Sequence, residues 1–400
     1  MGSYRYEILR ETTTDSLIME NNTREKKMNS NVYGIDLGTC NMKIYCKTSN
    51  KILNEKNTIA LVKKDQIYAY GDAAYAMYEK APETINVTFP VISGVIADFN
   101  NLQTMLQMYL EEHMKGKIRG AEFIVAVPTD ITDVEKRAFF EMFYKSKLKP
   151  KSVLLCEKPI ADAVGLGLDV NEPTGIMVVD IGADTTEISV ISLGGLVLSD
   201  LLHFGGNRID ESIITYVKRT YNLVIGQKTA QALKEKLGSG IPGNTETMVI
   251  VGRDVVSGLP IEMEITGEVV YEAIKDNLNS ICNSIKMILE KTPPELAKDI
   301  IHSGIYITGG SSQIHDLDQL FRDITGIEIN TCARMSLMLR RAPSDAQLTP
   351  EMQAKMKKIE NCLHCNKCKS KCPYGLDTPT LLQKNYEDYK RVLAGEVSVR

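Results

Sequence analysis

The sequence lacks any apolar run that approaches the roughly 18 residues a membrane span requires. Its N-terminal residues also lack the basic-then-apolar order of a signal peptide. The formal charge is −4, so basic residues are not in excess, and the composition does not indicate a nucleic-acid partner. Membrane contact is expected to be peripheral at most, through the mostly basic stretch at residues 114–119. These absences favour a cytoplasmic protein.

Cysteines are sparse over most of the chain and concentrated near its end. Five are scattered, at Cys40, Cys46, Cys156, Cys282 and Cys332. The other four lie within eleven residues, at Cys362, Cys365, Cys368 and Cys372. Because a disulfide framework is not expected in a cytoplasmic chain of this size, the cluster predicts a metal site.

The length of 400 residues favours two compact domains and a small appendage. Apolar runs such as residues 123–127 alternate with helical patterns such as residues 133–145, which predicts α/β architecture. We expect a flexible leader at 1–30, a first domain at 31–170 with a small subdomain at about 50–95, a second domain at 171–340 and a tail at 341–400.

A duplication is the most informative internal pattern. Residues 32–39 read VYGIDLGT, and residues 177–186, MVVDIGADTT, repeat that plan 144 positions later. Each copy predicts a strand that carries an aspartate near its end, followed by a glycine turn and a second strand. One copy alone is usually only a turn, but two on matching strands would place backbone N–H groups on both sides of a cleft, where they can cradle a triphosphate. Asp36 and Asp180 would then face a divalent cation, Mg²⁺ held through water.

Six stretches, in order, resemble the MreB/Mbl family of bacterial actin homologues. They lie at residues 35–41, 94–99, 179–187, 191–195, 292–296 and 308–310, and the resemblance covers residues 31–335. It implies a two-domain actin-like ATPase fold of the ribonuclease H-like class. It also implies ATP or ADP as ligand, self-association into filaments or dimers, and a role with the cell-shape machinery.

The resemblance assigns nucleotide-binding residues as well. The first phosphate turn holds Asp36, Gly38, Thr39, Cys40 and Asn41, and the second holds Asp180, Gly182, Ala183, Asp184 and Thr185, of which Thr185 is also implied as catalytic. The ribose or adenine is assigned to Gln231, Lys234, Glu235, Gly309, Gly310, Ser311 and Ser312. The first three of these share one helical face, for which a solvated surface is the alternative. Lys43 stands where eukaryotic actin keeps a phosphate-contacting lysine, and a plain surface lysine is its alternative.

Two positions depart from the family pattern. The family reads Glu-Glu-Pro where this chain has Glu157-Lys158-Pro159, and its second glutamate polarises the attacking water. The Lys158 ammonium has donors but no acceptor at neutral pH, so it cannot take a proton from water. The family also reads glycine at Asp184, whose carboxylate repels a triphosphate unless a cation intervenes.

Two interpretations of these departures are open. In the first, Lys158 and Asp184 form an ion pair across the cleft, so that nucleotide binds and hydrolysis is weak or absent. In the second, Glu157 shifts by one residue and supplies the base. Loss of a positioned base typically costs about 10² to 10⁴ in rate, so the first interpretation predicts weak ATPase activity.

The four clustered cysteines have the spacing C-x2-C-x2-C-x3-C-P of bacterial ferredoxins, which predicts a [4Fe–4S] cluster. Structural zinc is the alternative, although zinc ligand pairs usually lie farther apart. Either all four cysteines bind one cluster, or two chains exchange Cys372 and form a cluster-bridged dimer. Helical patterns that start at Thr349 and Thr378 flank the motif, and residues 348–397 resemble the ferredoxin-like tail of bacterial aldo-keto reductases.

Three functions are compatible with these patterns. The first is an ATP-binding cytoskeletal protein that forms or modulates filaments, with the cluster as a redox or oxygen sensor. The second is an ATP-gated reductive activator that delivers electrons to a partner enzyme. The third, a nucleotide-gated chaperone, is disfavoured because no substrate-binding domain is visible after the actin-like region. Weak hydrolysis favours the first function, since a reductive activator needs competent hydrolysis.

Overall fold

The computed structural model describes residues 31–49, 51–63, 66–114, 118–330 and 390. The predicted leader, the tail helices and the four clustered cysteines lie outside the described residues. Apart from residues 330 and 390, everything described belongs to a single unit that ends at Ile329. The domain boundaries expected at residues 170 and 340 stay predictions.

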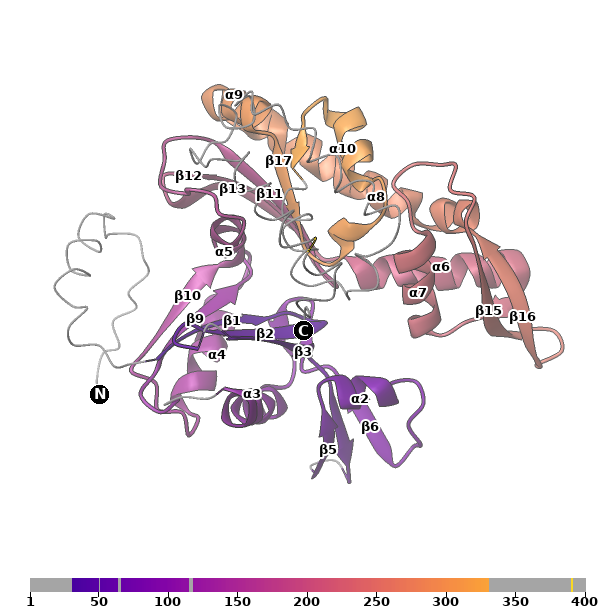
Figure 1. Ribbon diagram of the computed structural model, residues 1–400, viewed down its shortest axis with the longest axis horizontal. Coiled ribbons are helices and arrows are strands. Elements are labelled where there is room, and N and C mark those ends of the chain that lie inside the picture. Colours follow the sequence, from indigo (N-terminus) through magenta and orange to yellow (C-terminus); the bar gives the residue numbers. More distant parts are fainter. Residues whose placement is uncertain (1–30, 50, 64–65, 115–117, 331–389, 391–400) are drawn as a thin grey trace. The chain divides into compact units, whose positions relative to one another are not determined.

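The first half of the described chain builds a five-stranded sheet (Figure 1). Its order is β10-β9-β1-β2-β3, in which β1, β2 and β3 form an antiparallel meander and β9 runs parallel to both β1 and β10. The strands are β1 (Val32–Leu37), β2 (Asn41–Cys46), β3 (Lys51–Lys56), β9 (Glu122–Val127) and β10 (Ser152–Glu157). Strand β9 confirms the strand predicted at residues 123–127.

The second half repeats this plan in another five-stranded sheet. Its order is β13-β12-β11-β17-β18, in which β11 is antiparallel to β12 and parallel to β17. The strands are β11 (Ile176–Ile181), β12 (Thr186–Ser192), β13 (Gly195–Leu202), β17 (Ile305–Thr308) and β18 (Ile329–Asn330). The β1–β2 and β11–β12 turns therefore occupy equivalent places in the two sheets, as the duplicated sequence predicts.

Helices and smaller sheets complete the described part. The helices are α2 (Asp72–Met77), α3 (Phe99–His113), α4 (Asp133–Tyr144), α5 (Lys158–Gly165), α6 (Gly206–Tyr221), α7 (Gln227–Leu237), α8 (Gly267–Lys291), α9 (Pro294–Ser303), α10 (Leu317–Thr325) and the 3₁₀ turn η1 (Ser311–Gln313). The smaller sheets use β4 (Ile59–Val62), β5 (Gln66–Tyr70), β6 (Ile85–Thr88), β7 (Val91–Ile92), β8 (Val95–Ile96), β14 (Leu223–Val224), β15 (Thr247–Asp254) and β16 (Pro260–Thr266). Helix α4 confirms the helix predicted at residues 133–145, and Thr132 and Glu135 form the capping box that starts it.

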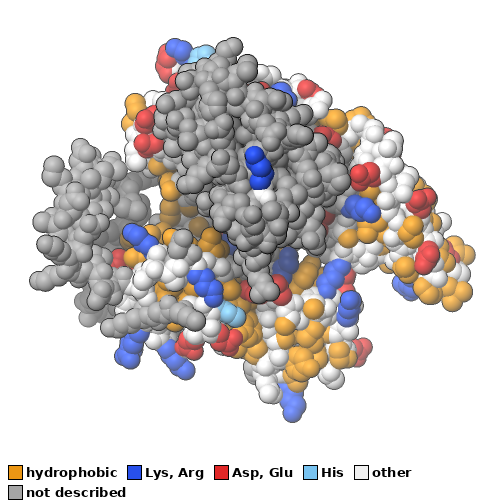
Figure 2. Space-filling model, viewed as in Figure 1, with side chains coloured by type: hydrophobic (Ala, Val, Ile, Leu, Met, Phe, Trp, Pro, Cys, Tyr) orange, Lys and Arg blue, Asp and Glu red, His pale blue; other side chains and the backbone are white. Residues whose placement is uncertain are grey.

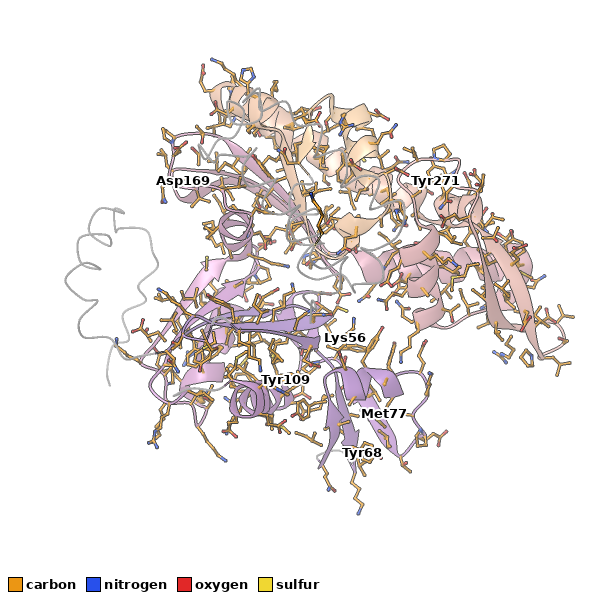
Figure 3. All side chains as sticks on the ribbon, in the orientation of Figure 1. Lys56, Tyr68, Met77, Tyr109, Asp169 and Tyr271 are labelled. Carbon is orange, nitrogen blue, oxygen red and sulfur yellow. The ribbon has the colours of Figure 1, made fainter. Side chains whose placement is uncertain are left out.

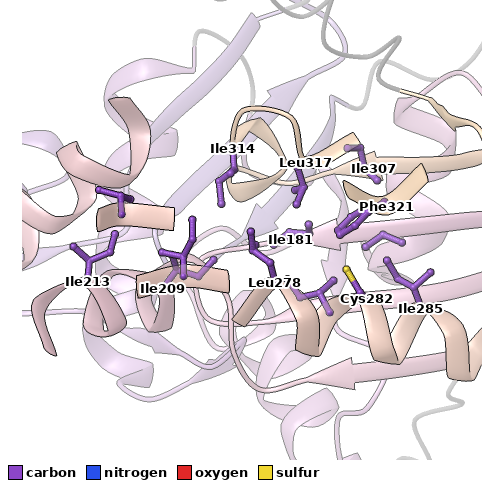
Figure 4. Packing of buried hydrophobic residues seen from close by; sticks show 14 of the residues in the cluster. Ile181, Ile209, Ile213, Leu278, Cys282, Ile285, Ile307, Ile314, Leu317 and Phe321 are labelled. Atoms are coloured by element: carbon purple, nitrogen blue, oxygen red, sulfur yellow. The ribbon is translucent and has the colours of Figure 1, made fainter. Parts of the chain in front are cut away.

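Each large sheet has its own apolar core. In the second, buried side chains of β11, α6, α8 and α10 meet, as Ile181, Ile209, Leu278 and Phe321 illustrate (Figure 4). Every residue of β11 is buried, which is typical of a strand covered on both faces. Burying one such side chain contributes roughly 1.5–3 kcal/mol, so the core fixes the end of β11 and the turn that follows it.

Helix α5 contacts both sheets, β9 and β10 in the first and β11 and β12 in the second. Lys158 is the first residue of this helix. Helix α5 therefore places Lys158 beside the ends of the strands that carry the two glycine turns.

Candidate functional site

The first glycine turn joins β1 to β2. A Cβ at Gly38 would lie 2.8 Å from the carbonyl oxygen of Asn41, so the turn has no room for a side chain there. Asn57 is fully buried behind the turn, and its Nδ2 donates to the carbonyl oxygen of Gly38 at 2.8 Å. A neutral amide thus supports this turn.

Two lysines lie beside the first turn. Lys43 Nζ is 2.9 Å from Asp36 Oδ2. Lys56 Nζ donates to Cys40 Sγ at 3.1 Å and to Asn41 Oδ1 at 3.3 Å. Lys56 is the last residue of β3 (Figure 3), and sequence reasoning missed it because only the β2–β3 register brings it beside Asn41. Two ammonium groups therefore flank the turn, which suits phosphate.

The second glycine turn joins β11 to β12. The N–H of Gly182 donates to the carbonyl oxygen of Thr185 at 2.8 Å and closes the turn. Helix α6 backs it, because the N–H of Gly206 donates to the carbonyl oxygen of Gly182 at 3.0 Å and the N–H of Asn207 donates to that of Ala183 at 2.7 Å. The start of α6 thus fixes the backbone of this turn.

Asp184 is held by two neutral donors. The N–H of Ser93 donates to its Oδ2 at 2.9 Å, and Asn207 Nδ2 donates to its Oδ1 at 2.7 Å. Lys158 instead pairs with Asp180. The predicted ion pair between Lys158 and Asp184 is therefore wrong, because the β7–β8 hairpin and α6 satisfy the Asp184 carboxylate.

Lys158 lies among carboxylates. Its Nζ is 2.5 Å from Asp180 Oδ2. Burial works to lower the pKa of Lys158, but the charges of Asp180, Asp36 and Asp162 outweigh it and raise that pKa, so the ammonium keeps its proton. Glu157 is exposed at the end of β10, and it is Lys158 that faces Asp180. This arrangement gives no support to Glu157 as the base.

Asp36 is influenced by both lysines of the site. Burial works to raise its pKa, but the neighbouring charges of Lys43 and Lys158 outweigh burial and lower that pKa. Asp36 is therefore ionised at neutral pH, and its charge is balanced by ammonium groups of the protein itself.

The β7–β8 hairpin ties the two glycine turns together. Its turn residues, Ser93 and Gly94, have φ of 51° and 79°, as a tight two-residue hairpin turn requires. The N–H of Gly94 donates to Thr39 Oγ1 in the first turn at 3.4 Å, and the N–H of Ser93 donates to Asp184 in the second. One small hairpin thus links both turns.

Gly309 and the serines after it lie behind the second turn. Gly309 has φ of 88°, and a Cβ there would clash with Asp180 Oδ1. Ser311 Oγ donates to the carbonyl oxygen of Gly182 at 3.1 Å, and Ser312 Oγ donates to that of Gly309 at 2.8 Å. These residues support the second turn, and their predicted contact with the nucleotide base stays a prediction.

On helix α7, Gln231 contacts both helix α2 and Glu235. Tyr75 Oη donates to Gln231 Oε1 at 2.8 Å, and Gln231 Nε2 donates to Glu235 Oε1 at 2.7 Å. The predicted role of Gln231 and Glu235 in binding ribose or adenine stays a prediction.

Lys234, on the same helix, is buried. Its Nζ lies 2.8 Å from Asp210 Oδ1 and donates to the carbonyl oxygen of Gly206 at 2.9 Å. Burial raises the pKa of Asp210 to about 6, against the opposing charge of Lys234. Because Gly206 also binds the second turn, this ion pair supports that turn from behind.

Sequence reasoning missed two carboxyl groups close to Lys158, of which Glu187 is buried and Asp162 is partly buried. Asp162 follows Lys158 by one turn of α5, a spacing that the sequence does show. Its Oδ2 has no hydrogen-bond partner among the described residues, and burial together with the charge of Asp180 raises its pKa well above the usual value. Glu187 lies opposite Asp180 in the β11–β12 register and accepts from the N–H of Thr129 at 3.0 Å. Burial raises the pKa of Glu187 despite that hydrogen bond.

A divalent cation does not fit the charges at the two aspartates. Asp36 is already paired with Lys43, and Asp180 with Lys158. Two further positive charges beside these ammonium groups would be repelled. The geometry therefore does not support the Mg²⁺ site predicted at Asp36 and Asp180.

Comparison with known proteins decides the family. A family model described as MreB/Mbl protein matches residues 30–339. The chain belongs to the MreB/Mbl family. The cell shape-determining protein Mbl of Bacillus subtilis is 40% identical over 293 residues, which cover 72% of this chain and 87% of the relative. The cell shape-determining protein MreB of Escherichia coli is 39% identical over 311 residues, which cover 76% and 89%.

Solved MreB structures confirm the actin-like fold. MreB5 of Spiroplasma citri bound to ADP is 33% identical, with a TM-score of 0.72, and the match covers 76% of this chain and 91% of that one. The same protein bound to AMPPNP is 31% identical, with a TM-score of 0.72 and coverage of 84% and 99%. A MamK double helical filament, 22% identical with a TM-score of 0.64 and coverage of 76% and 94%, shows the fold alone.

A second family model, described as a 4Fe-4S dicluster domain, matches residues 325–377 of this MreB/Mbl chain. That range contains five cysteines, which suffice for one four-cysteine cluster and not for two. The model supports the predicted iron–sulfur cluster, while the likeness to aldo-keto reductase tails stays a prediction. None of the helices in the described part is both long and apolar enough to cross a bilayer.

Proposed function

We propose that this protein is a cytoplasmic, ATP-binding member of the MreB/Mbl family that assembles with copies of itself, contributes to cell shape, and hydrolyses ATP slowly or not at all. The observation that carries the proposal is the ion pair between Lys158 and Asp180. It places a permanent cation where the family resemblance implies a catalytic glutamate.

Nucleotide binding is supported by the two glycine turns and their lysines. Lys43 and Lys56 lie beside the first turn and Lys158 beside the second, so three ammonium groups are available for phosphate oxygens. The Spiroplasma relatives bound to ADP and AMPPNP support the same ligand class, ATP or ADP.

Slow hydrolysis follows from the chemistry of Lys158. A protonated amine cannot accept a proton from the attacking water, and a missing base typically costs about 10² to 10⁴ in rate. Release of inorganic phosphate from ATP by the purified full chain tests this. We expect turnover near background, and the Glu157→Ala variant should not change it. Brisk turnover that Glu157→Ala abolishes would show that Glu157 is the base and would overturn the proposal.

Self-association is supported by apolar side chains exposed on the β15–β16 hairpin (Figure 2). Val249 and Val251 on β15 are each 59% exposed, and Val256 at the hairpin end is 85% exposed. Contact with a second copy would remove this apolar surface from water. Sedimentation of the full chain with ATP tests the proposal: the wild type should pellet above a critical concentration.

A matched pair of variants locates the contact. Val251→Asp together with Val256→Asp should reduce the pelleted fraction, because each places a charge on the apolar hairpin. Val134→Asp, on the exposed face of α4, makes the same chemical change elsewhere and should leave pelleting unchanged. A wild type that stays in the supernatant at all concentrations would contradict self-association.

The cysteine tail is proposed to bind one [4Fe–4S] cluster that acts as a redox or oxygen sensor. The ferredoxin spacing and the 4Fe-4S domain model support the cluster. Anaerobic purification with an iron count and a visible spectrum tests it. Colourless protein that contains zinc would end the redox proposal.

The same tail makes an ATP-gated reductive activator the second candidate function, with a redox partner enzyme in place of the cell-shape machinery. Sedimentation and electron transfer to a dye acceptor separate the two candidates. Failure to pellet, combined with ATP-dependent electron transfer, would favour the activator over the cytoskeletal function.

A further inference from the structure

Lysines occupy the place at the two aspartates where a divalent cation is expected. Asp36 Oδ2 is 2.9 Å from Lys43 Nζ, and Asp180 Oδ2 is 2.5 Å from Lys158 Nζ. Each aspartate is the second-last residue of its strand, just before a glycine turn, so both ion pairs lie where the turns would meet phosphate groups. The two lysines together carry two positive charges, the same charge as one Mg²⁺ ion.

The charges of this cluster are balanced without a metal. Asp36 and Asp180 contribute two negative charges, which Lys43 and Lys158 neutralise. Two further carboxyl groups lie nearby, the partly buried Asp162 and the buried Glu187, and the pKa of each is raised, which favours the neutral form. A divalent cation would therefore find Asp36 and Asp180 already paired with ammonium groups; among the described carboxylates of the two turns, only Asp184, held by neutral donors, has no cationic partner.

The position of Lys158 is fixed by packing of the elements around it, unlike that of a surface lysine. It comes from the first residue of α5, which packs on strands of both sheets. Asp180 is buried in the core of the second sheet. An ammonium has three N–H donors, and a phosphate oxygen can accept from those that the Asp180 oxygen does not use.

We propose that this protein binds nucleoside triphosphates without a divalent metal, with the ammonium groups of Lys158 and Lys43 donating hydrogen bonds to the phosphate oxygens in the place of Mg²⁺. This inference rests on the proposed nucleotide binding and concerns the ionic form of the ligand. It replaces the expected metal complex of ATP by free ATP as the bound species.

Equilibrium binding of a fluorescent ATP analogue to the full chain tests the proposal, with either excess Mg²⁺ or excess EDTA in the buffer. We expect the Kd of the wild type to change by less than about threefold between the two buffers. The Lys158→Glu variant removes the ammonium and adds a carboxylate beside Asp180. Its Kd should be at least about tenfold weaker in EDTA than in Mg²⁺, because a metal must then neutralise the cluster.

The Lys145→Glu variant is the matched control, since it makes the same charge change at an exposed lysine just after α4 and should behave like the wild type in both buffers. Thermal melting reports whether each variant folds, and Mg²⁺ should raise the Tm of nucleotide-loaded Lys158→Glu but not that of the wild type. Wild-type binding that requires Mg²⁺ overturns the metal-free proposal and leaves the proposed nucleotide binding intact. Absence of binding in both buffers overturns both proposals.

Discussion

The two glycine turns have the same backbone plan and different electrostatic surroundings. In the first turn, the lysine and aspartate side chains of the Lys43–Asp36 pair are 46% and 25% exposed. In the second, those of the Lys158–Asp180 pair are 21% and 6% exposed. Water screens the first pair far more than the second, so the same kind of ion pair has a different energetic weight in each turn.

The residues that hold each turn from behind also differ in charge and burial. A neutral amide, Asn57, holds the carbonyl oxygen of Gly38 in the first turn. The second turn is held through Gly206, whose own carbonyl oxygen accepts from Lys234 of the buried pair with Asp210. The duplicated motif therefore preserves the strand–turn–strand geometry, while the charges around the two copies differ.

The largest expected difference between the turns is the cost of removing each lysine. Lys158→Ala leaves Asp180 buried without its partner, which should lower the free energy of unfolding by about 3–5 kcal/mol. Lys43→Ala affects a partly exposed pair and should cost less than about 1 kcal/mol. Urea denaturation at low and moderate salt measures both values. Equal losses of unfolding free energy in the two variants would show that the two ion pairs have the same energetic weight.

The next difference is a pH dependence confined to the second turn. Burial raises the pKa of Asp210 to about 6, from the 3.8 that is usual for an aspartate. The contribution of Asp210 to stability is therefore fully present below about pH 4 and is lost as pH rises through about 6. At 1.36 kcal/mol per pKa unit, the wild type should lose about 3 kcal/mol across this window relative to Asp210→Asn. Denaturation midpoints from pH 4 to pH 7 measure this loss.

Asn57→Ala is the matched variant for the first turn. It removes a neutral support and should lower stability by a similar amount at every pH, so its curve stays parallel to that of the wild type. A wild-type curve that is also parallel to that of Asp210→Asn would show that the buried pair does not titrate in this range.

A smaller effect is expected at the glycines behind the second turn. Gly309 has positive φ, and a Cβ there meets Asp180, so Gly309→Ala should cost about 2 kcal/mol or more. Gly310 has φ of −64° and nothing within 4 Å of a Cβ, so Gly310→Ala should be close to neutral. Thermal denaturation compares the two, and a Gly310→Ala cost equal to that of Gly309→Ala would contradict the geometry.

The sequence predicted the parts of this structure that depend on local pattern. Periodicity predicts the duplicated strands and the helix at residues 133–145, and the structure confirms both. The six stretches that resemble the MreB/Mbl family predict the actin-like class, which the comparisons confirm. The partner of Asp184 was not predictable, because Ser93 is 91 positions away in sequence and reaches it only through a hairpin. Lys158 was singled out correctly as the unusual residue, but only packing of α5 on both sheets shows that it faces Asp180.

Phosphate release by the Lys158→Glu variant with ATP and Mg²⁺ tests whether Lys158 stands in the place of a catalytic base. We expect near-background turnover by the wild type and an increase of about 10²-fold or more in the variant, because a carboxylate then stands where the base is missing. Brisk turnover by the wild type that falls in Lys158→Glu would contradict the account.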